Sequence, residues 1–124
     1  MPARFKALAL DAKDHQTLAD WWCDALGYER REPPAGYTEQ PPEWPVPIYD
    51  PEGPGPLIWI NPVSDAKTVK NRVHMDVFGN TQELLAMGAV LVRARDEEIG
   101  WDILQDPEGN EFCVFDPKPR AVRG

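Results

Sequence analysis

The feature that most constrains how this chain can fold is a four-residue signature that occurs twice. Asp-Pro-Glu-Gly occupies residues 50–53 and again residues 106–109. One such turn says little, because any hairpin can use it. Here each copy also follows a triplet suited to ending a helix, Ala25-Leu26-Gly27 in the first half and Ala86-Met87-Gly88 in the second. Self-similarity of this kind predicts a duplicated structural unit.

Two further matches strengthen the repeat. A tryptophan lies upstream of each turn, Trp44 in the first half and Trp101 in the second. Ala9-Leu10-Asp11 also aligns with His74-Met75-Asp76. Each half is therefore expected to contain a strand, a helix, a glycine and then three strands.

The spacing of apolar residues predicts the first elements of the chain. Phe5 to Asp11 is predicted as a strand, with Leu8 and Leu10 on one face. A helix from His15 to Leu26 is predicted next, because Asp14 is a favourable N-cap and Gly27 is suited to ending a helix. Its apolar stripe, which should pack in the core, consists of Leu18, Trp21, Trp22, Ala25 and Leu26. His15 is predicted to be a solvated residue of the first turn.

Three more strands are predicted in the first half, at residues 28–32, 46–49 and 57–61. Residues 33–45 are rich in proline and are predicted as an irregular loop. The strand at 46–49 should lie at a sheet edge, because Pro45 and Pro47 cannot donate hydrogen bonds.

The second half is predicted to repeat this order. In a strand at residues 72–78, alternation places His74 and Asp76 on one face, opposite the face that should pack against a helix. Asn80 and Glu83 match a capping box that opens a helix from Thr81 to Met87. Further strands are predicted at residues 89–93, 101–105 and 111–115. Alternation also puts Val73, Met75, Phe112 and Val114 on the helix side of the sheet.

Composition narrows the class of protein. With 124 residues, of which 42% are hydrophobic, the chain has the size of one folded domain. Its net charge of −8 disfavours nucleic acid as a partner. The two cysteines do not make a disulfide framework. No membrane span and no signal peptide are expected, so a cytoplasmic protein without membrane partners is predicted.

Three segments resemble the vicinal oxygen chelate superfamily, which includes glyoxalases, bleomycin resistance proteins and extradiol dioxygenases. They are residues 14–27, the run Lys70 to Asp76, and Trp101 to Phe115, and the last two resemble a glyoxalase-like subfamily. The resemblance implies an α+β fold of two tandem βαβββ modules, with mixed sheets curling around a shared cleft. It implies a single glyoxalase-like domain over residues 1–124, with module one at 4–61, a linker at 62–70, module two at 71–115 and a tail at 116–124. This fold serves many activities, so the resemblance does not choose among them.

Enzymes of this superfamily usually hold a divalent metal with His and Glu ligands from the first and last strand of each module. Transferred one position at a time, these ligand places fall at Ala7 or Ala9, near Trp59, at His74 and at Cys113. Neither alanine nor tryptophan can bind a metal, and Cys113 stands where a glutamate is expected. The resemblance therefore implies a degenerate metal site, and no cofactor is predicted.

Other ligands for a metal remain open. Strand alternation puts Glu111 beside Cys113 and Asp76 beside His74, so these four residues could bind a soft divalent metal. If a metal is present, His74, Glu111 and Cys113 are the expected ligands. The alternative is that His74 is a pocket histidine bonded to a neighbouring acid, and that Cys113 is a small buried apolar residue.

Three functions are compatible with this pattern. The leading hypothesis is a small-molecule binding protein for an organic ligand, because tryptophans on or beside strands suit a planar molecule. The candidate ligand-binding residues are Trp59, His74, Asp76, Trp101, Glu111 and Cys113. The alternative is a lyase, isomerase or dioxygenase that uses a metal, or His74 as a general base oriented by Asp76. A third hypothesis is an accessory domain that acts through protein contacts. A homodimer is also predicted, because the superfamily commonly pairs chains.

Overall fold

The computed structural model describes residues 2, 4–37 and 41–116, and it divides into two compact units. Unit 1 is Met1–Ala66 and unit 2 is Lys67–Gly124. The predicted tail lies outside the described residues except for Asp116, and so do residues 38–40 of the predicted proline-rich loop. None of the helices in the described ranges combines the length and apolarity needed to cross a membrane.

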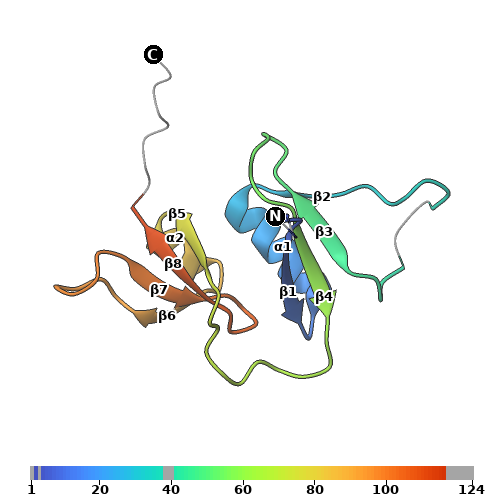
Figure 1. The fold of residues 1–124 in the computed structure, drawn as a ribbon. Coiled ribbons are helices and arrows are strands. Elements are labelled where there is room, and N and C mark those ends of the chain that lie inside the picture. The colour runs from blue at the N-terminus through green and yellow to red at the C-terminus, as the bar shows by residue number, and fades with distance from the viewer. Residues whose placement is uncertain (1, 3, 38–40, 117–124) are drawn as a thin grey trace, which may run out of the picture. The chain divides into compact units, whose positions relative to one another are not determined.

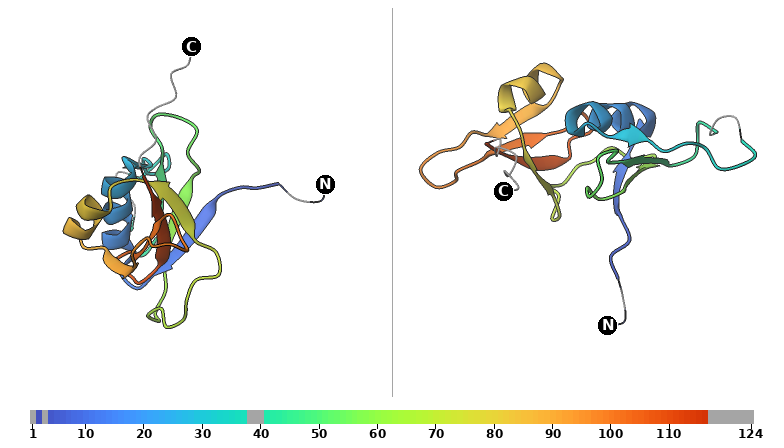
Figure 2. Two further views of the ribbon diagram at one scale, coloured as in Figure 1. Left: turned by 90° about the vertical axis from the view of Figure 1, so that its left-hand side faces the viewer. Right: turned by 90° about the horizontal axis from the view of Figure 1, so that it is seen from above.

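Unit 1 is a four-stranded mixed sheet with one helix against it (Figures 1 and 2). The strands lie in the order β1-β4-β3-β2, with β1 and β4 parallel and the other pairs antiparallel. Its elements along the chain are β1 (Leu8–Ala12), α1 (His15–Leu26), β2 (Glu29–Arg30), β3 (Val46–Tyr49) and β4 (Ile58–Pro62).

Unit 2 repeats this topology. Its strands lie in the order β5-β8-β7-β6, with β5 and β8 parallel and the other pairs antiparallel. The elements are β5 (Met75–Phe78), α2 (Thr81–Ala86), β6 (Val90–Arg93), β7 (Asp102–Gln105) and β8 (Glu111–Phe115). The predicted α+β fold of two βαβββ modules with mixed sheets is therefore confirmed, whereas the shared cleft stays a prediction.

The duplicated Asp-Pro-Glu-Gly signature forms the same turn in both units. The backbone N–H of Gly53 donates to the carbonyl of Asp50 at 3.2 Å, and that of Gly109 donates to the carbonyl of Asp106 at 2.9 Å. In each turn the aspartate side chain also accepts the N–H two residues on, from Glu52 or Glu108. An aspartate is needed at this position because its carboxylate satisfies backbone donors that the turn leaves unpaired.

Sheet register shows which residues of the two units correspond. Trp59 pairs with Ala9 and Pro47, and Cys113 pairs with Asp76 and Ile103. Trp59 in β4 therefore occupies the place of Cys113 in β8, and Ala9 that of Asp76. The sequence alignment of Ala9 with His74 is wrong by two residues, because the turn signature did not fix the register of the first strand.

Helix α1 begins and ends as its sequence dictates. The carboxylate of Asp14 accepts the backbone N–H of Thr17 at 3.2 Å, and Gly27 closes the helix in the left-handed conformation with φ of 72°. Leu18 and Trp22 are each only 1% exposed. On the sheet, the residues that share this core are Val46, Ile48, Ile58 and Ile60.

Helix α2 is shorter and buries less. Asn80 caps it by accepting the N–H of Glu83 at 3.0 Å, as predicted. Leu84 is its buried residue among those described. The hydroxyl of Thr81 also donates to the carboxylate of Asp102 in β7 at 2.5 Å. This hydrogen bond ties the helix to the sheet and is the main cause that lowers the pKa of Asp102.

Several element boundaries differ from the predictions. Strands β1 and β5 begin three residues later than expected, so that Phe5 and Val73 are 74% and 78% exposed. The prediction that Val73 packs on the helix side of its sheet is therefore wrong. Phe112 and Val114 are buried, as predicted.

The edge position predicted for β3 is also wrong, because β3 lies between β4 and β2. The carbonyl of Pro47 accepts the N–H of Arg31 at 2.9 Å. In an antiparallel strand the N–H and C=O of one residue face the same neighbour. The donor that Pro47 lacks therefore faces the end of the two-residue strand β2, where a single missing hydrogen bond is tolerated.

Candidate functional site

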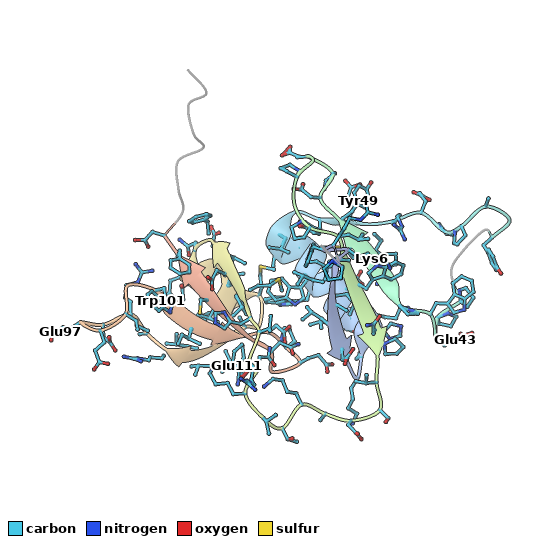
Figure 3. The ribbon with its side chains drawn as sticks, viewed as in Figure 1. Lys6, Glu43, Tyr49, Glu97, Trp101 and Glu111 are labelled. Atoms are coloured by element: carbon cyan, nitrogen blue, oxygen red, sulfur yellow. The ribbon has the colours of Figure 1, made fainter. Side chains whose placement is uncertain are left out.

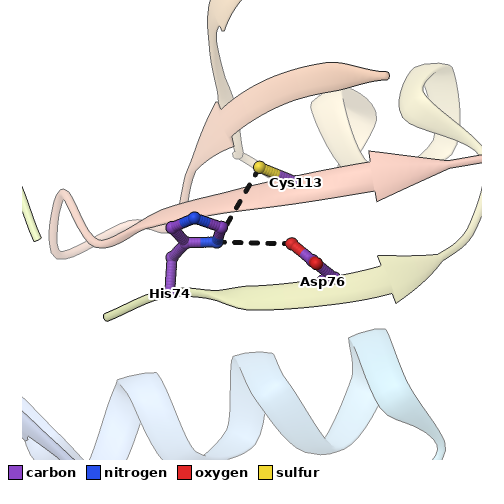
Figure 4. A group of neighbouring side chains, drawn as sticks. All are labelled: His74, Asp76 and Cys113. Carbon is purple, nitrogen blue, oxygen red and sulfur yellow. Dashed lines mark hydrogen bonds and ion pairs between the residues drawn. The ribbon is translucent and has the colours of Figure 1, made fainter. Parts of the chain in front are cut away.

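Three predicted site residues of unit 2 converge at one place (Figure 4). His74 immediately precedes β5, rather than lying inside a strand as predicted, whereas Asp76 and Cys113 face each other across β5 and β8. The Nδ1 atom of His74 lies 3.3 Å from Oδ1 of Asp76 and 3.8 Å from Sγ of Cys113. The donor atoms of all three lie within 4.8 Å of one another.

The electrostatics of this cluster keep the Cys113 thiol protonated. Burial raises the pKa of Cys113, and the neighbouring carboxylate of Asp76 raises it further. The thiolate is the nucleophilic form of cysteine. Cys113 is therefore not an activated nucleophile by itself.

The spacing of the cluster fits part of a tetrahedral metal shell. With usual zinc bond lengths, tetrahedral ligands are about 3.3 Å apart for an N···O pair and about 3.6 Å for an N···S pair. The corresponding separations here are 3.3 and 3.8 Å. Two of the three separations among His74, Asp76 and Cys113 therefore suit ligands of a soft divalent ion, which would have to displace the thiol proton.

The same atoms also fit a histidine–carboxylate pair without a metal. If Nδ1 of His74 carries a proton, it can donate toward Asp76, and Nε2 is left as the basic nitrogen. Metal binding needs the lone pair of Nδ1, whereas this pair needs a proton there. The two arrangements are mutually exclusive.

Glu111 does not join the cluster, although alternation places it near Cys113. Its carboxylate lies 2.8 Å from Nζ of Lys67 and accepts the backbone N–H of Asn71, also at 2.8 Å. Burial would raise the pKa of Glu111, but these two hydrogen bonds outweigh it and hold the pKa below its usual range. Glu111 thus anchors the segment that leads to His74.

Trp101 packs on an aromatic neighbour of its own sheet. Its ring centroid lies 5.5 Å from that of Phe115, which in turn lies 6.5 Å from Phe78. Phe78 is 62% exposed. These rings extend the face that carries Cys113, and Figure 3 labels both Trp101 and Glu111 on this sheet.

The corresponding face of unit 1 is aromatic instead. Trp59 forms one wall of a pocket of about 380 Å³. We call it the Trp59 pocket, and its lining consists of Arg31, Glu32, Pro34, Trp44, Pro45, Pro47 and Trp59. None of the described histidines or cysteines lines it, so the His74–Asp76–Cys113 cluster of unit 2 has no counterpart in this pocket.

Two cations lie over the indole ring of Trp59. The guanidinium carbon of Arg31 is 5.1 Å and Nζ of Lys6 is 5.6 Å from the ring centroid. These distances are typical of cation–π contacts. The indole Nε1 of Trp59 is buried, with no hydrogen-bond partner in the described part of the chain.

The other wall of the pocket is held by His15. Nε2 of His15 lies 2.9 Å from the carbonyl oxygen of Trp44, and His15 is only 8% exposed. Because a carbonyl can only accept, His15 donates here. The prediction of a solvated His15 is wrong. A usable signal was present, since His15 continues the apolar stripe at i, i+3 and i+7 with Leu18 and Trp22.

Sequence reasoning also missed Arg31 and Lys6. Arg31 lies just beyond β2, and its place beside Trp59 depends on the pairing of Arg31 with Pro47 in the neighbouring strand. The sequence does not fix the register of β2 against β3, because the long loop of residues 31–45 separates the two strands. For Lys6, which precedes β1, the sequence contains no signal either.

The chain belongs to the glyoxalase-like domain family, whose model matches residues 7–115. That is the class of protein to which the two copies of the βαβββ topology point. No curated protein matches the sequence significantly.

Solved structures share the fold at low identity. A glyoxalase/bleomycin resistance protein/dioxygenase family enzyme from Burkholderia phytofirmans is 17% identical with a TM-score of 0.65, over 90% of this chain and 97% of that one. A fosfomycin resistance protein from Listeria monocytogenes, complexed with Mn(II) and sulfate, is 13% identical with a TM-score of 0.66, over 95% and 93%. TioX from Micromonospora is 16% identical with a TM-score of 0.55, over 94% and 100%. At these identities the likeness shows the fold alone.

Proposed function

We propose that this chain is a glyoxalase-like small-molecule binding protein with a degenerate metal site. The observation that carries the proposal is the pair of residues at the metal-ligand places of unit 1. Ala7 and Trp59 stand there, where unit 2 has His74 and Cys113, because the register of the first and last strands matches Ala9 with Asp76 and therefore Ala7 with His74. Neither alanine nor tryptophan can bind a metal, and Trp59 instead forms the wall of a pocket.

The lining of the Trp59 pocket suits binding rather than catalysis. Trp44 and Trp59 offer flat apolar surfaces, and the three prolines of the lining lose little entropy when a ligand packs on them. The volume of about 380 Å³ lies within the usual range for small-molecule sites. A ligand held by shape and stacking needs no Lewis acid.

The test is an NMR titration of the full chain, labelled with ¹⁵N and freed of metal by chelation. The added compounds are 2-naphthoate and 2-naphthamide, which share one flat ring system. Saturable shifts of the indole N–H signals of Trp44 and Trp59 are expected with at least one of them. Trp59→Ala should abolish the shift at Trp44, whereas Tyr49→Ala, an exposed change on the neighbouring strand, should not. If neither compound shifts either signal at millimolar concentration, the proposal is wrong.

A second candidate function is an enzyme that works at the unit 2 cluster. The convergence of His74, Asp76 and Cys113 favours it. The cluster would serve either as a partial metal shell or as a histidine general base oriented by Asp76. The fosfomycin resistance protein of the same fold is described as complexed with Mn(II).

Calorimetric titration of the metal-free protein with Zn(II), Mn(II), Ni(II) and Fe(II) separates the two candidates. An enzyme with a resident metal would bind one ion with a dissociation constant below about a micromolar, or about 8 kcal/mol. His74→Ala would abolish that binding. The small-molecule binding protein should bind all four ions more weakly.

We also infer a cytoplasmic homodimer. Both cysteines, Cys23 and Cys113, are free, as is usual in a reducing compartment. All four residues of edge strand β6 are exposed, and three of them are apolar. An exposed apolar edge strand needs a cover. Light scattering at micromolar concentration should give twice the chain mass of 14.0 kDa, and the monomer mass would contradict the dimer.

A further inference from the structure

We propose that the ligand of the Trp59 pocket is a flat aromatic molecule that carries an anionic group, of the aromatic carboxylate class. This inference rests on the proposed small-molecule binding function and adds the charge of the ligand. The juxtaposition that carries it is a tryptophan wall with two of the protein's own cations above it.

The shape of the pocket selects a flat ring. The backbone of Trp44 is held by the hydrogen bond from His15 to its carbonyl oxygen, and the backbone of Trp59 lies within β4. Pro47 lies in β3, directly across from Trp59 in the sheet. Rigid apolar walls of this kind favour a planar ligand, because stacking on them needs little reordering of side chains.

The charges at the pocket select an anion. Among the described residues, neither Arg31 nor Lys6 forms an ion pair, although the protein as a whole carries a charge of −8. Glu32 also lines the pocket and is exposed, as Arg31 and Lys6 are, and the three side chains together carry one net positive charge. A carboxylate beside Arg31 would form charge-assisted hydrogen bonds.

A cationic ligand is disfavoured by the same residues. The electron-rich face of an indole ring normally attracts cations. Here Arg31 and Lys6 already hold that position over Trp59, at 5.1 and 5.6 Å. An incoming ammonium group would be repelled by both and would have to displace one.

The test compares three probes that share one ring system and differ in charge. Isothermal titration calorimetry of the metal-free full chain uses 2-naphthoate, neutral 2-naphthamide and the 2-naphthylmethylammonium cation. We expect 2-naphthoate to bind at least about tenfold more tightly than 2-naphthamide, and the cation to bind more weakly than both. Arg31→Leu should weaken 2-naphthoate about tenfold and change 2-naphthamide less than about twofold.

Arg30→Leu is the matched control. It removes the same charge from the adjacent residue, whose side chain turns to Asp20 and Gln16 of helix α1 instead. Its affinity for 2-naphthoate should stay within about twofold of wild type. Circular dichroism checks that both variants are folded, and Arg30→Gln replaces Arg30→Leu if the latter is not.

Each contradictory outcome points to a different failure. Equal affinity for 2-naphthoate and 2-naphthamide, or equal weakening of both by Arg31→Leu, would overturn the anion preference and leave small-molecule binding intact. Tightest binding of the ammonium probe would also overturn it. If none of the three probes binds, both the anion preference and the proposed function fail.

Discussion

Trp59 in unit 1 and Cys113 in unit 2 occupy the same place in two sheets of the same strand order, yet the side chains around them differ in their chemistry. Around Cys113 stand His74 and Asp76, which bring three potential metal ligands within 4.8 Å. Around Trp59 stand two cations and a proline-rich pocket. Unit 2 thus carries potential metal ligands at this place, whereas unit 1 carries an aromatic ring on which a flat ligand could stack.

The helix-facing sides of the two sheets differ far less. Ile58 and Ile60 in β4 correspond to Phe112 and Val114 in β8, and all four are at most 1% exposed. Packing against a helix restricts those positions to apolar residues of suitable volume. The opposite face is free of that restriction, so chemistry in a duplicated fold can diverge there without loss of the fold.

The largest expected effect concerns the unequal helices. Trp22→Ala in α1 should lower the free energy of unfolding by about 3–5 kcal/mol, because Trp22 is 1% exposed and fills the core of unit 1. Leu84→Ala in the six-residue helix α2 should cost less, near the lower end of about 2–5 kcal/mol. Urea denaturation measures both. A greater loss from Leu84→Ala would show that unit 2 depends more on its helix than its burial indicates.

The two cysteines should both be slow to react, for similar reasons. Burial raises the pKa of Cys23 to about 11, and burial with the Asp76 carboxylate raises that of Cys113. In the Cys113→Ser variant only Cys23 can react with a disulfide reagent. It should react roughly a hundredfold more slowly than a free thiol at pH 8, and its reaction rate should rise with pH. Cys23→Ser isolates Cys113 for the same assay. A fast reaction of Cys113 near neutral pH would instead indicate a thiolate stabilised by protonated His74.

The two histidines should differ in their effect on stability. His15→Ala should lower the free energy of unfolding by about 1–3 kcal/mol, since it leaves the carbonyl of Trp44 without its donor. His74→Ala should change it by no more than about 0.5 kcal/mol, because that side chain is 37% exposed. The same denaturation assay compares them. A larger loss from His74→Ala would assign His74 a structural role.

A smaller effect than that of His15→Ala is the pH dependence of stability that Glu111 contributes in unit 2. The pKa of Glu111 is held below its ordinary range by Asn71 and Lys67, so its contribution to stability is present above that range. It is lost as the pH falls through the lowered folded-state value. Glu111→Gln keeps an acceptor for the N–H of Asn71 but cannot be protonated. Below about pH 5 this variant should therefore lose about 1 kcal/mol less of its free energy of unfolding than the wild type does. An unchanged slope would contradict the ion pair with Lys67.

Much of the fold could be predicted because short sequence motifs mark the helix ends and the turns of each repeat. Asp14, Gly27 and Asn80 cap helices as expected, and both Asp-Pro-Glu-Gly turns form. Each of these signals acts within a few residues of the chain. The starts of β1 and β5 were missed because a strand begins where its partner begins, and that depends on long-range pairing.

The candidate site was predictable only in part, for the same reason. Strand alternation brought His74 and Asp76 to the side of Cys113, but it could not reveal that Lys67 and Asn71 hold Glu111. The cations over Trp59 come from residues far from it in sequence, on either side of α1. Contacts of this kind are set by tertiary packing, so no periodic pattern in the sequence predicts them.

The most direct test of a metal-independent binding site is the affinity of 2-naphthoate measured by calorimetry with and without metal. The titration is done on the chelator-treated full chain, on the same protein with saturating Zn(II) or Mn(II), and on His74→Ala. A binding site at Trp59 that needs no metal predicts dissociation constants that agree within about twofold in all of these. Binding that appears only with metal and disappears in His74→Ala would contradict it, and would assign the function to the cluster of unit 2.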